Sequence, residues 1–221
     1  MCLFNLLNAS LRENNHQREE VLLAELRALP ARDSSSNVSV LNIVGMSLVN
    51  ALTYGENRGD LQRSDALLEE LGRLARAHSA NEGLKKQLLS GINNTLQENG
   101  DLTRLEARIK LLRALTTKRA TDQEIRKLYC KALLKERLLF ENTGAIGQRR
   151  GALNKLRVLA RKHPGDINVN SALMLALMRE IDVEQNSAIL TELHKEIRKL
   201  PNTIVGRAMI QSGMARLPTG N

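Results

Sequence analysis

The chain carries the phrase LLAELRALP at residues 22–30, and similar phrases return four more times. They are LLEELGRLA at 67–75, IKLLRALTT at 109–117, LNKLRVLAR at 153–161 and HKEIRKLPN at 194–202. Each phrase holds an apolar pair three positions apart: Leu26/Leu29, Leu71/Leu74, Leu112/Leu115, Leu156/Leu159 and Ile197/Leu200. Successive pairs are separated by 45, 41, 44 and 41 residues. A period of this length indicates a solenoid or another array of similar repeats.

A second apolar pattern follows each phrase, and in it every fourth residue is apolar. It is clearest at Val40/Val44/Leu48/Leu52, Leu84/Leu88/Ile92/Leu96 and Val169/Leu173/Leu177/Ile181, and weaker at Val205/Met209/Gly213/Leu217. This spacing predicts a second helix in each repeat, with these side chains on one face. In the third repeat Arg137 interrupts the series after Ile125, Tyr129 and Leu133, so we expect the apolar face to shift to Leu138.

A small residue lies seven positions after the start of each apolar series. These residues are Ser47, Gly91, Ala132, Ala176 and Ser212. Because a short side chain lets a neighbouring helix approach closely, we expect them at tight helix crossings. Ala and Ser are common in helices for other reasons, but the shared position in every repeat favours the packing interpretation.

The turns repeat as well. Glu-Asn occurs at 56–57, 98–99 and 141–142, and Gly59, Gly100 and Gly144 follow, where glycine takes the positive φ that often ends a helix. Each repeat is therefore predicted to contain helix A, a loop, helix B and a turn. We expect a single domain, 1–221, with a half repeat at 1–15 and repeats at 16–61, 62–103, 104–147, 148–185 and 186–221.

This organisation resembles the tetratricopeptide-like superfamily of α-helical repeat proteins. The Leu71-Gly72 pair and the series of small residues match features of that class. The repeat is longer than the usual length of about 34 residues, and HEAT-type helix pairs are a competing assignment. The resemblance implies an all-α fold, namely a right-handed α-solenoid of antiparallel helix pairs with about five repeats plus an N-terminal half repeat. It also implies binding of other proteins along a concave face.

The composition argues against several classes of function. No P-loop, GxSxG, HExxH or dinucleotide-binding motif occurs, so we expect a protein that is not an enzyme and needs no cofactor or metal. No run reaches the roughly 18 apolar residues of a membrane span, and the N-terminus lacks the pattern of a signal peptide. Cys2 and Cys130 are predicted to be free thiols of a cytoplasmic protein.

The net charge of +9 is concentrated in one segment. Residues 104–162 contain 17 Lys and Arg against 5 Asp and Glu, whereas the rest of the chain contains 16 against 19. Such a segment attracts an acidic protein, phosphate or nucleic acid, although a run of charges also serves as a solvated surface.

Polar residues recur in two rows along the B helices, ten and two residues after the start of the apolar series. The partner-binding residues predicted from these rows and from the neighbouring lysine of the third repeat are Asn42, Asn50, Lys86, Asn94, Lys127, Lys131, Lys135 and Arg179. Parallel rows of amide and cationic groups suit an extended peptide backbone or a phosphate chain. The alternative is that each residue simply belongs to the polar side of an amphipathic helix.

Four other residues have predicted roles at helix ends. His78 and His163 occupy the same position in their repeats, where a partly positive imidazole suits the end of helix A. Asp33 and Asp166 are expected to accept hydrogen bonds at the start of helix B.

Two functions remain open from the sequence. The first is a non-enzymatic scaffold that binds an acidic protein or peptide, possible roles being regulatory or immunity-type. The alternative is binding of nucleic acid, RNA in particular, through residues 104–162. Against the alternative, the chain has only four aromatic residues, Phe4, Tyr54, Tyr129 and Phe140, and bases usually stack on exposed rings.

Overall fold

The structure, a computed structural model, describes residues 2–32, 38–96, 101–118 and 121–200. All ten elements in these ranges are α-helices, which confirms the predicted all-α class. The predicted B helix at 205–217, together with Asp33, Gly100 and Ser212, lies outside them. The chain divides into two compact units, residues 1–99 and 100–221, and each is described by itself.

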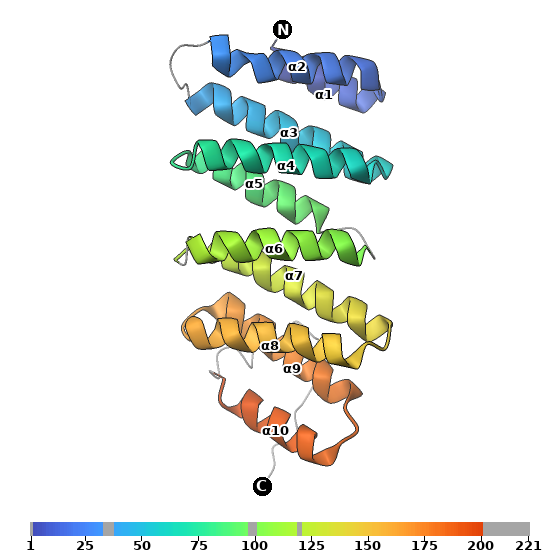
Figure 1. Ribbon diagram of the computed structural model, residues 1–221, viewed down its shortest axis with the longest axis vertical. Coiled ribbons are helices and arrows are strands. Elements are labelled where there is room, and N and C mark those ends of the chain that lie inside the picture. The colour runs from blue at the N-terminus through green and yellow to red at the C-terminus, as the bar shows by residue number, and fades with distance from the viewer. Residues whose placement is uncertain (1, 33–37, 97–100, 119–120, 201–221) are drawn as a thin grey trace. The chain divides into compact units, whose positions relative to one another are not determined.

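The N-terminal unit is built around one central helix. Its described helices are α1 (Leu3–Glu13), α2 (His16–Arg32), α3 (Val38–Arg58), α4 (Leu61–Ala77) and α5 (Glu82–Thr95). Consecutive helices run in alternating directions (Figure 1), and α3 packs against each of the other four. The apolar series that starts at Val40 therefore lies in the middle of this unit.

The C-terminal unit has two helices with several neighbours. Its described helices are α6 (Leu102–Lys118), α7 (Gln123–Asn142), α8 (Ile146–Lys162), α9 (Ile167–Val183) and α10 (Ser187–Arg198). Helix α7 packs against α6, α8 and α9, and α9 also packs against α8 and α10. Thus α2, α4, α6, α8 and α10 are the A helices that carry the repeated phrase, and α3, α5, α7 and α9 are the B helices.

Helix α3 is long and apolar enough, by length and composition alone, to cross a membrane, a property that the sequence analysis did not recognise. Half of the apolar window is buried inside the protein, and a core helix passes the same test. Its place at the centre of the N-terminal unit accounts for its apolar character.

The small residues of the B helices are buried, as predicted. Ser47, Ala132 and Ala176 have no exposed surface. Gly91 is also buried, and a Cβ atom added there would lie 3.2 Å from Cδ1 of Leu68 in the preceding A helix. Burial is thus shown at these four positions, and the predicted close approach of a neighbouring helix is confirmed for Gly91.

The expected shift of the apolar face to Leu138 is wrong. Arg137 keeps the buried position of the series and is 1% exposed, whereas Leu138 is 38% exposed. The guanidinium group remains there because it pairs with Glu180 of α9 at 3.1 Å and with Glu141 at 2.5 Å. A buried charge is tolerated when it is paired. Arg137 can therefore occupy a position that holds leucine in other repeats, and the same face of the helix stays buried.

A buried position of helix A varies in chemistry from repeat to repeat. This position lies seven residues before the first residue of each apolar pair (Leu26, Leu71, Leu112 and Leu156). It is occupied by Glu19, Ser64, Leu105 and Arg149, and none of them is more than 8% exposed. The polar members have partners on other helices: Glu19 pairs with Arg58 and Arg63, Arg149 pairs with Glu180, and Ser64 Oγ donates to the carbonyl oxygen of Leu52 at 3.2 Å. We name this the variable core position.

Polar side chains begin the helices, and glycines end two of them. Asp166 accepts from the backbone N–H groups of Asn168 and Val169 at the start of α9, which confirms its predicted role. Gly59 and Gly144 have φ of +75° and +70° after α3 and α7, as expected from the turn signals. The same role at the end of α1 falls to Asn14, whose φ is 58°.

His78 and His163 follow the last residues of α4 and α8, as predicted. The expectation of a partly positive imidazole is wrong for His163. Burial and the neighbouring Arg126 guanidinium lower the pKa of its imidazole below the ordinary value. The His163 ring is therefore neutral at pH values where an ordinary histidine is already partly charged.

Candidate functional site

The asparagines of the predicted B-helix rows are engaged inside the N-terminal unit. Asn50 Nδ2 donates to Oδ1 of Asn8 at 2.9 Å, and Asn94 Nδ2 donates to Oγ1 of Thr53 at 2.8 Å. Asn42 packs against Gly83, where an added Cβ atom would be 2.2 Å from its Oδ1, and this buried oxygen has no hydrogen-bond partner within the described residues. These contacts join neighbouring B helices, so the amides serve packing rather than forming an open row.

The basic residues of the same rows fall into two groups. Lys86, Lys127 and Arg179 are exposed on α5, α7 and α9. Lys131 and Lys135 are half-buried on α7 and both interact with other groups, and burial lowers the pKa of Lys131. Of the eight predicted residues, Asn42, Asn50, Lys86 and Asn94 belong to the N-terminal unit, and the other four belong to the C-terminal unit.

Much of the positive charge between 104 and 162 is compensated by acids that lie further along the chain. Arg126 pairs with Asp166 at 2.6 Å, and Arg149 pairs with Glu180 at 2.9 Å. The other pairs that reach beyond residue 162 are Arg137–Glu180, Arg150–Glu184 and Arg157–Glu196. The segment is therefore less of a free cationic surface than its composition indicates.

The buried Asp166 and Glu19 carboxylates are held ionised by such contacts. Burial alone would raise the pKa of Asp166, but hydrogen bonds from Arg126 and from the Val169 and Asn168 N–H groups outweigh it and lower the pKa. The pKa of Glu19 is lowered in the same way, because hydrogen bonds from Arg58 and Arg63 exceed the effect of burial.

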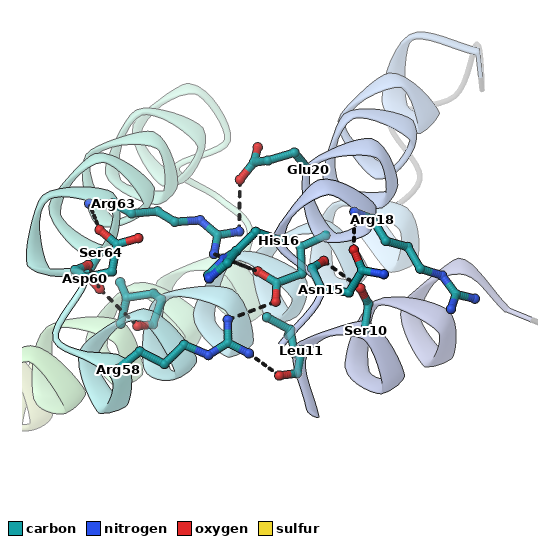
Figure 2. Close-up of polar contacts among 12 residues, drawn as sticks. Ser10, Leu11, Asn15, His16, Arg18, Glu20, Arg58, Asp60, Arg63 and Ser64 are labelled. Carbon is teal, nitrogen blue, oxygen red and sulfur yellow. Dashed lines mark hydrogen bonds and ion pairs between the residues drawn. The ribbon is translucent and has the colours of Figure 1, made fainter. Parts of the chain in front are cut away.

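The Glu19 cluster is a structural junction of four helices. Glu19, which has no exposed surface, lies 2.9 Å from Arg58 and 2.7 Å from Arg63. Figure 2 shows Arg58 and Arg63 approaching from α3 and α4, with His16 of α2 beside them and an Arg58 hydrogen bond to the Leu11 carbonyl oxygen of α1. With its charges matched and buried, the cluster links the helices and presents no open site.

Neighbouring A helices are bridged by an ion pair that recurs at one position of the repeat. Arg27, one residue after Leu26, donates two hydrogen bonds to Glu70, one residue before Leu71, at 2.7 and 2.8 Å. Arg157, one residue after Leu156, contacts both carboxylate oxygens of Glu196, one residue before Ile197, at 2.7–3.1 Å. The two pairs join α2 to α4 and α8 to α10.

The α6–α8 junction has two cations at this position instead. Arg113 follows Leu112 and Lys155 precedes Leu156, so both partners are positively charged. Lys155 turns to Glu136 of α7, whose carboxylate oxygens lie 2.7 and 2.9 Å from its Nζ. The ion pair that bridges the other A helices therefore cannot form between α6 and α8.

A groove of about 820 Å³ lies at this junction. α6 and α8 form its walls, and the buried side chains of Tyr129 and Glu136 of α7 lie at its base. The remaining residues that line it are Glu106, Ile109, Lys110, Arg113, Thr116, Thr117, Gly151, Asn154, Lys155, Val158, Leu159, Lys162 and His163. The groove combines the apolar side chains of Ile109, Val158 and Leu159 with several cations, which suits a partly apolar, negatively charged ligand.

The cations of the groove are not matched by its acids. Lys155 is paired with Glu136. Within the described part of the chain, Lys110, Arg113 and Lys162 have no ion-pair partner, and Glu106 is the other acid that lines the groove. These residues were not predicted as a site from the sequence. Their spacing could have indicated two cationic helix faces, because residues 110 and 113 share one face of α6 and residues 155 and 162 share one face of α8.

The described residues offer no place for a metal ion that His, Cys, Asp and Glu would hold in a group of three or more. Cys130 is buried in α7, and burial raises the pKa of its thiol to about 12, so it remains protonated. The groove is consequently the candidate site, and its chemistry is recognition of charge.

No protein-family model, curated protein or solved structure matches the chain. The resemblance to tetratricopeptide-like proteins therefore stays a prediction from the sequence. The function has to be argued from the residues of the groove.

Proposed function

We propose that the protein is a non-enzymatic, tetratricopeptide-like helical-repeat scaffold that binds an acidic segment of a partner protein in the groove between α6 and α8. One observation carries the proposal. Lys110, Arg113 and Lys162 lack ion-pair partners within the described residues, and they line a groove that also contains Ile109, Val158 and Leu159. A ligand that brings carboxylates to these cations and apolar side chains to these three residues satisfies both features.

The recurrence of buried positions supports the repeat part of the proposal. The variable core position is buried in α2, α4, α6 and α8, and the small residue of helix B is buried in α3, α5, α7 and α9. The Arg–Glu pair between A helices also recurs once in each compact unit. Recurrent interfaces between successive helix pairs are what an α-solenoid needs, since each pair leaves one face to be covered by the next.

A peptide fits the groove better than RNA does. Tyr129, the one Phe, Tyr or Trp residue of the lining, is 7% exposed and offers no ring face on which a base could stack. Asn154, Thr116 and Thr117 provide amide and hydroxyl groups for a peptide backbone, and Val158, which is 45% exposed, provides apolar contact.

Fluorescence anisotropy tests this proposal with the full chain. The probes are a short labelled peptide that alternates Glu with Leu and Ser, the same peptide with Gln in place of Glu, and a single-stranded RNA. We expect the Glu peptide to bind, with an affinity that falls as salt is added, and the Gln peptide and the RNA to bind at least about tenfold more weakly. Preferential binding of the RNA would overturn the proposal in favour of the nucleic-acid alternative.

Charge-reversal variants locate the binding surface. Lys110→Glu combined with Lys162→Glu should weaken binding of the Glu peptide by about tenfold or more, corresponding to about 1.4 kcal/mol. Arg73→Glu, an exposed position of α4, controls for net charge, and Lys127→Glu tests the B-helix row. If Lys127→Glu weakens binding as much as the groove variants do, the binding site is not the groove.

A further inference from the structure

The α6–α8 junction lacks a carboxylate that the corresponding junctions contain. At the other two junctions between successive A helices of one compact unit, α2–α4 and α8–α10, a glutamate of one helix receives hydrogen bonds from an arginine of its neighbour. These pairs are half-buried, with exposed side-chain fractions of 35% and 28% for Arg27 and Glu70, and 28% and 30% for Arg157 and Glu196. Each places one carboxylate between two A helices.

Arg113 occupies the arginine position of this pattern and has no ion-pair partner among the described residues. A guanidinium group binds a carboxylate through two parallel hydrogen bonds, the arrangement that Arg27 and Arg157 adopt. Lys155 occupies the glutamate position. Its ammonium group has three donors, its side chain is 45% exposed, and Glu136 accepts from it inside the groove.

We infer that Arg113 and Lys155 form a binding site for a single carboxylate, which an acidic side chain of the partner supplies in place of the missing glutamate between α6 and α8. This inference rests on the proposed function and narrows it from a cationic groove to one anchoring position. The other charged groups around the site are Lys110, Lys162, Glu106, Glu136 and His163. Glu136 stays with Lys155, so the ligand carboxylate is held mainly by the guanidinium group of Arg113.

An anchoring position differs from general attraction in how the binding energy is distributed along the peptide. A carboxylate that is held by two hydrogen bonds contributes more than its neighbours, whereas diffuse attraction weights every carboxylate nearly equally. The same distinction applies to the protein. Lys110 lies on the same helix and in the same groove, but outside the repeated ion-pair position, so Lys110→Gln is the matched control for Arg113→Gln.

A double-mutant cycle tests the inference. Each Glu of the labelled peptide is changed to Gln in turn, and anisotropy measures binding to the wild type, Arg113→Gln and Lys110→Gln. We expect one peptide position at which the Gln substitution weakens binding to the wild type at least about fivefold but changes binding to Arg113→Gln less than about twofold. For the Lys110→Gln variant, the Gln substitution at this peptide position should still weaken binding as it does for the wild type.

The outcomes separate the inference from the proposed function. If the peptide binds and every position couples equally to Arg113 and Lys110, the anchoring site is refuted and the general groove remains. If the Glu peptide does not bind at all, both fail. The variant Arg113→Glu tests the anchoring site independently, because it introduces a carboxylate of the protein itself at the position opposite Lys155. This variant should lose the peptide and keep or raise its melting temperature, and a clear fall in that temperature would also count against the anchoring site.

Discussion

Removal of the Glu180 charge should strongly destabilise the C-terminal unit. Glu180 is 2% exposed, and its oxygens lie 3.1 Å from Arg137, 2.9 Å from Arg149 and 3.6 Å from Arg150. The substitution Glu180→Gln keeps the size of the side chain but leaves two buried guanidinium groups without this carboxylate. The prediction concerns the free energy of unfolding, because the contacts tie α7, α8 and α9 together.

The magnitude follows from the geometry. At about 3 Å and an effective dielectric constant of about 20, each close pair contributes roughly 5 kcal/mol of attraction before desolvation is subtracted. Removing one partner of a buried pair typically costs about 3–5 kcal/mol. Arg137 keeps Glu141 at 2.5 Å, and Arg150 is 44% exposed, so part of the charge stays compensated. We therefore expect a loss of about 3 kcal/mol, at the lower end of this range.

Urea unfolding followed by circular dichroism measures this loss, and amide hydrogen exchange in α7 and α9 assigns it to the C-terminal unit. Arg137→Leu is the control. Leu52 and Leu96 occupy the same position in α3 and α5, and Glu180 keeps Arg149, so this change should alter stability by less than about 1 kcal/mol. The reasoning is refuted if Glu180→Gln is as stable as the wild type, or if Arg137→Leu loses just as much.

Three further outcomes are expected from urea unfolding. Leu173→Ala, at a 4% exposed position of α9, should cost about 2–5 kcal/mol, and a loss below about 1 kcal/mol would show that its site is not tightly packed. Ala176→Leu, at a fully buried position, should cost about 1–3 kcal/mol through overpacking, whereas an unchanged midpoint would mean that the crossing has room. The pKa values of Glu19 and Asp166 are lowered by folding, so their stabilisation is complete above about pH 4 and is lost as the pH falls through the folded-state values. Asp166→Asn keeps the helix cap and should flatten this acid dependence, and an acid profile identical to that of the wild type would contradict the role of its charge.

The helices could be predicted from the sequence because their signals are local. Apolar periodicity placed the B helices, Asp166 marked the start of α9, and Gly59 and Gly144 marked turns. The burial of Arg137 could not be predicted in this way, because hydropathy assigns every arginine to the exposed side of a helix. The residue that keeps it buried, Glu180, lies 43 positions away.

The candidate site was harder to predict for a related reason. Charges were counted within residues 104–162, but Asp166, Glu180 and Glu196 neutralise part of that segment from outside it. A usable signal was present, because these acids lie 40, 31 and 39 residues after Arg126, Arg149 and Arg157. Two of these separations are near one repeat length and connect neighbouring predicted repeats, whereas Arg149 and Glu180 lie within one of them.

The variable core position has a consequence for folding fidelity. An array of identical repeats invites pairing between the wrong partners, and misassembly of this kind is characteristic of repeat proteins. Here Glu19 of α2 meets Arg58 and Arg63, whereas Arg149 of α8 meets Glu180. A chain that docked α2 in the place of α8 would bring Glu19 beside Glu180 and leave Arg137 to offset two buried carboxylates instead of one, so we expect the buried charges to disfavour this misassembly.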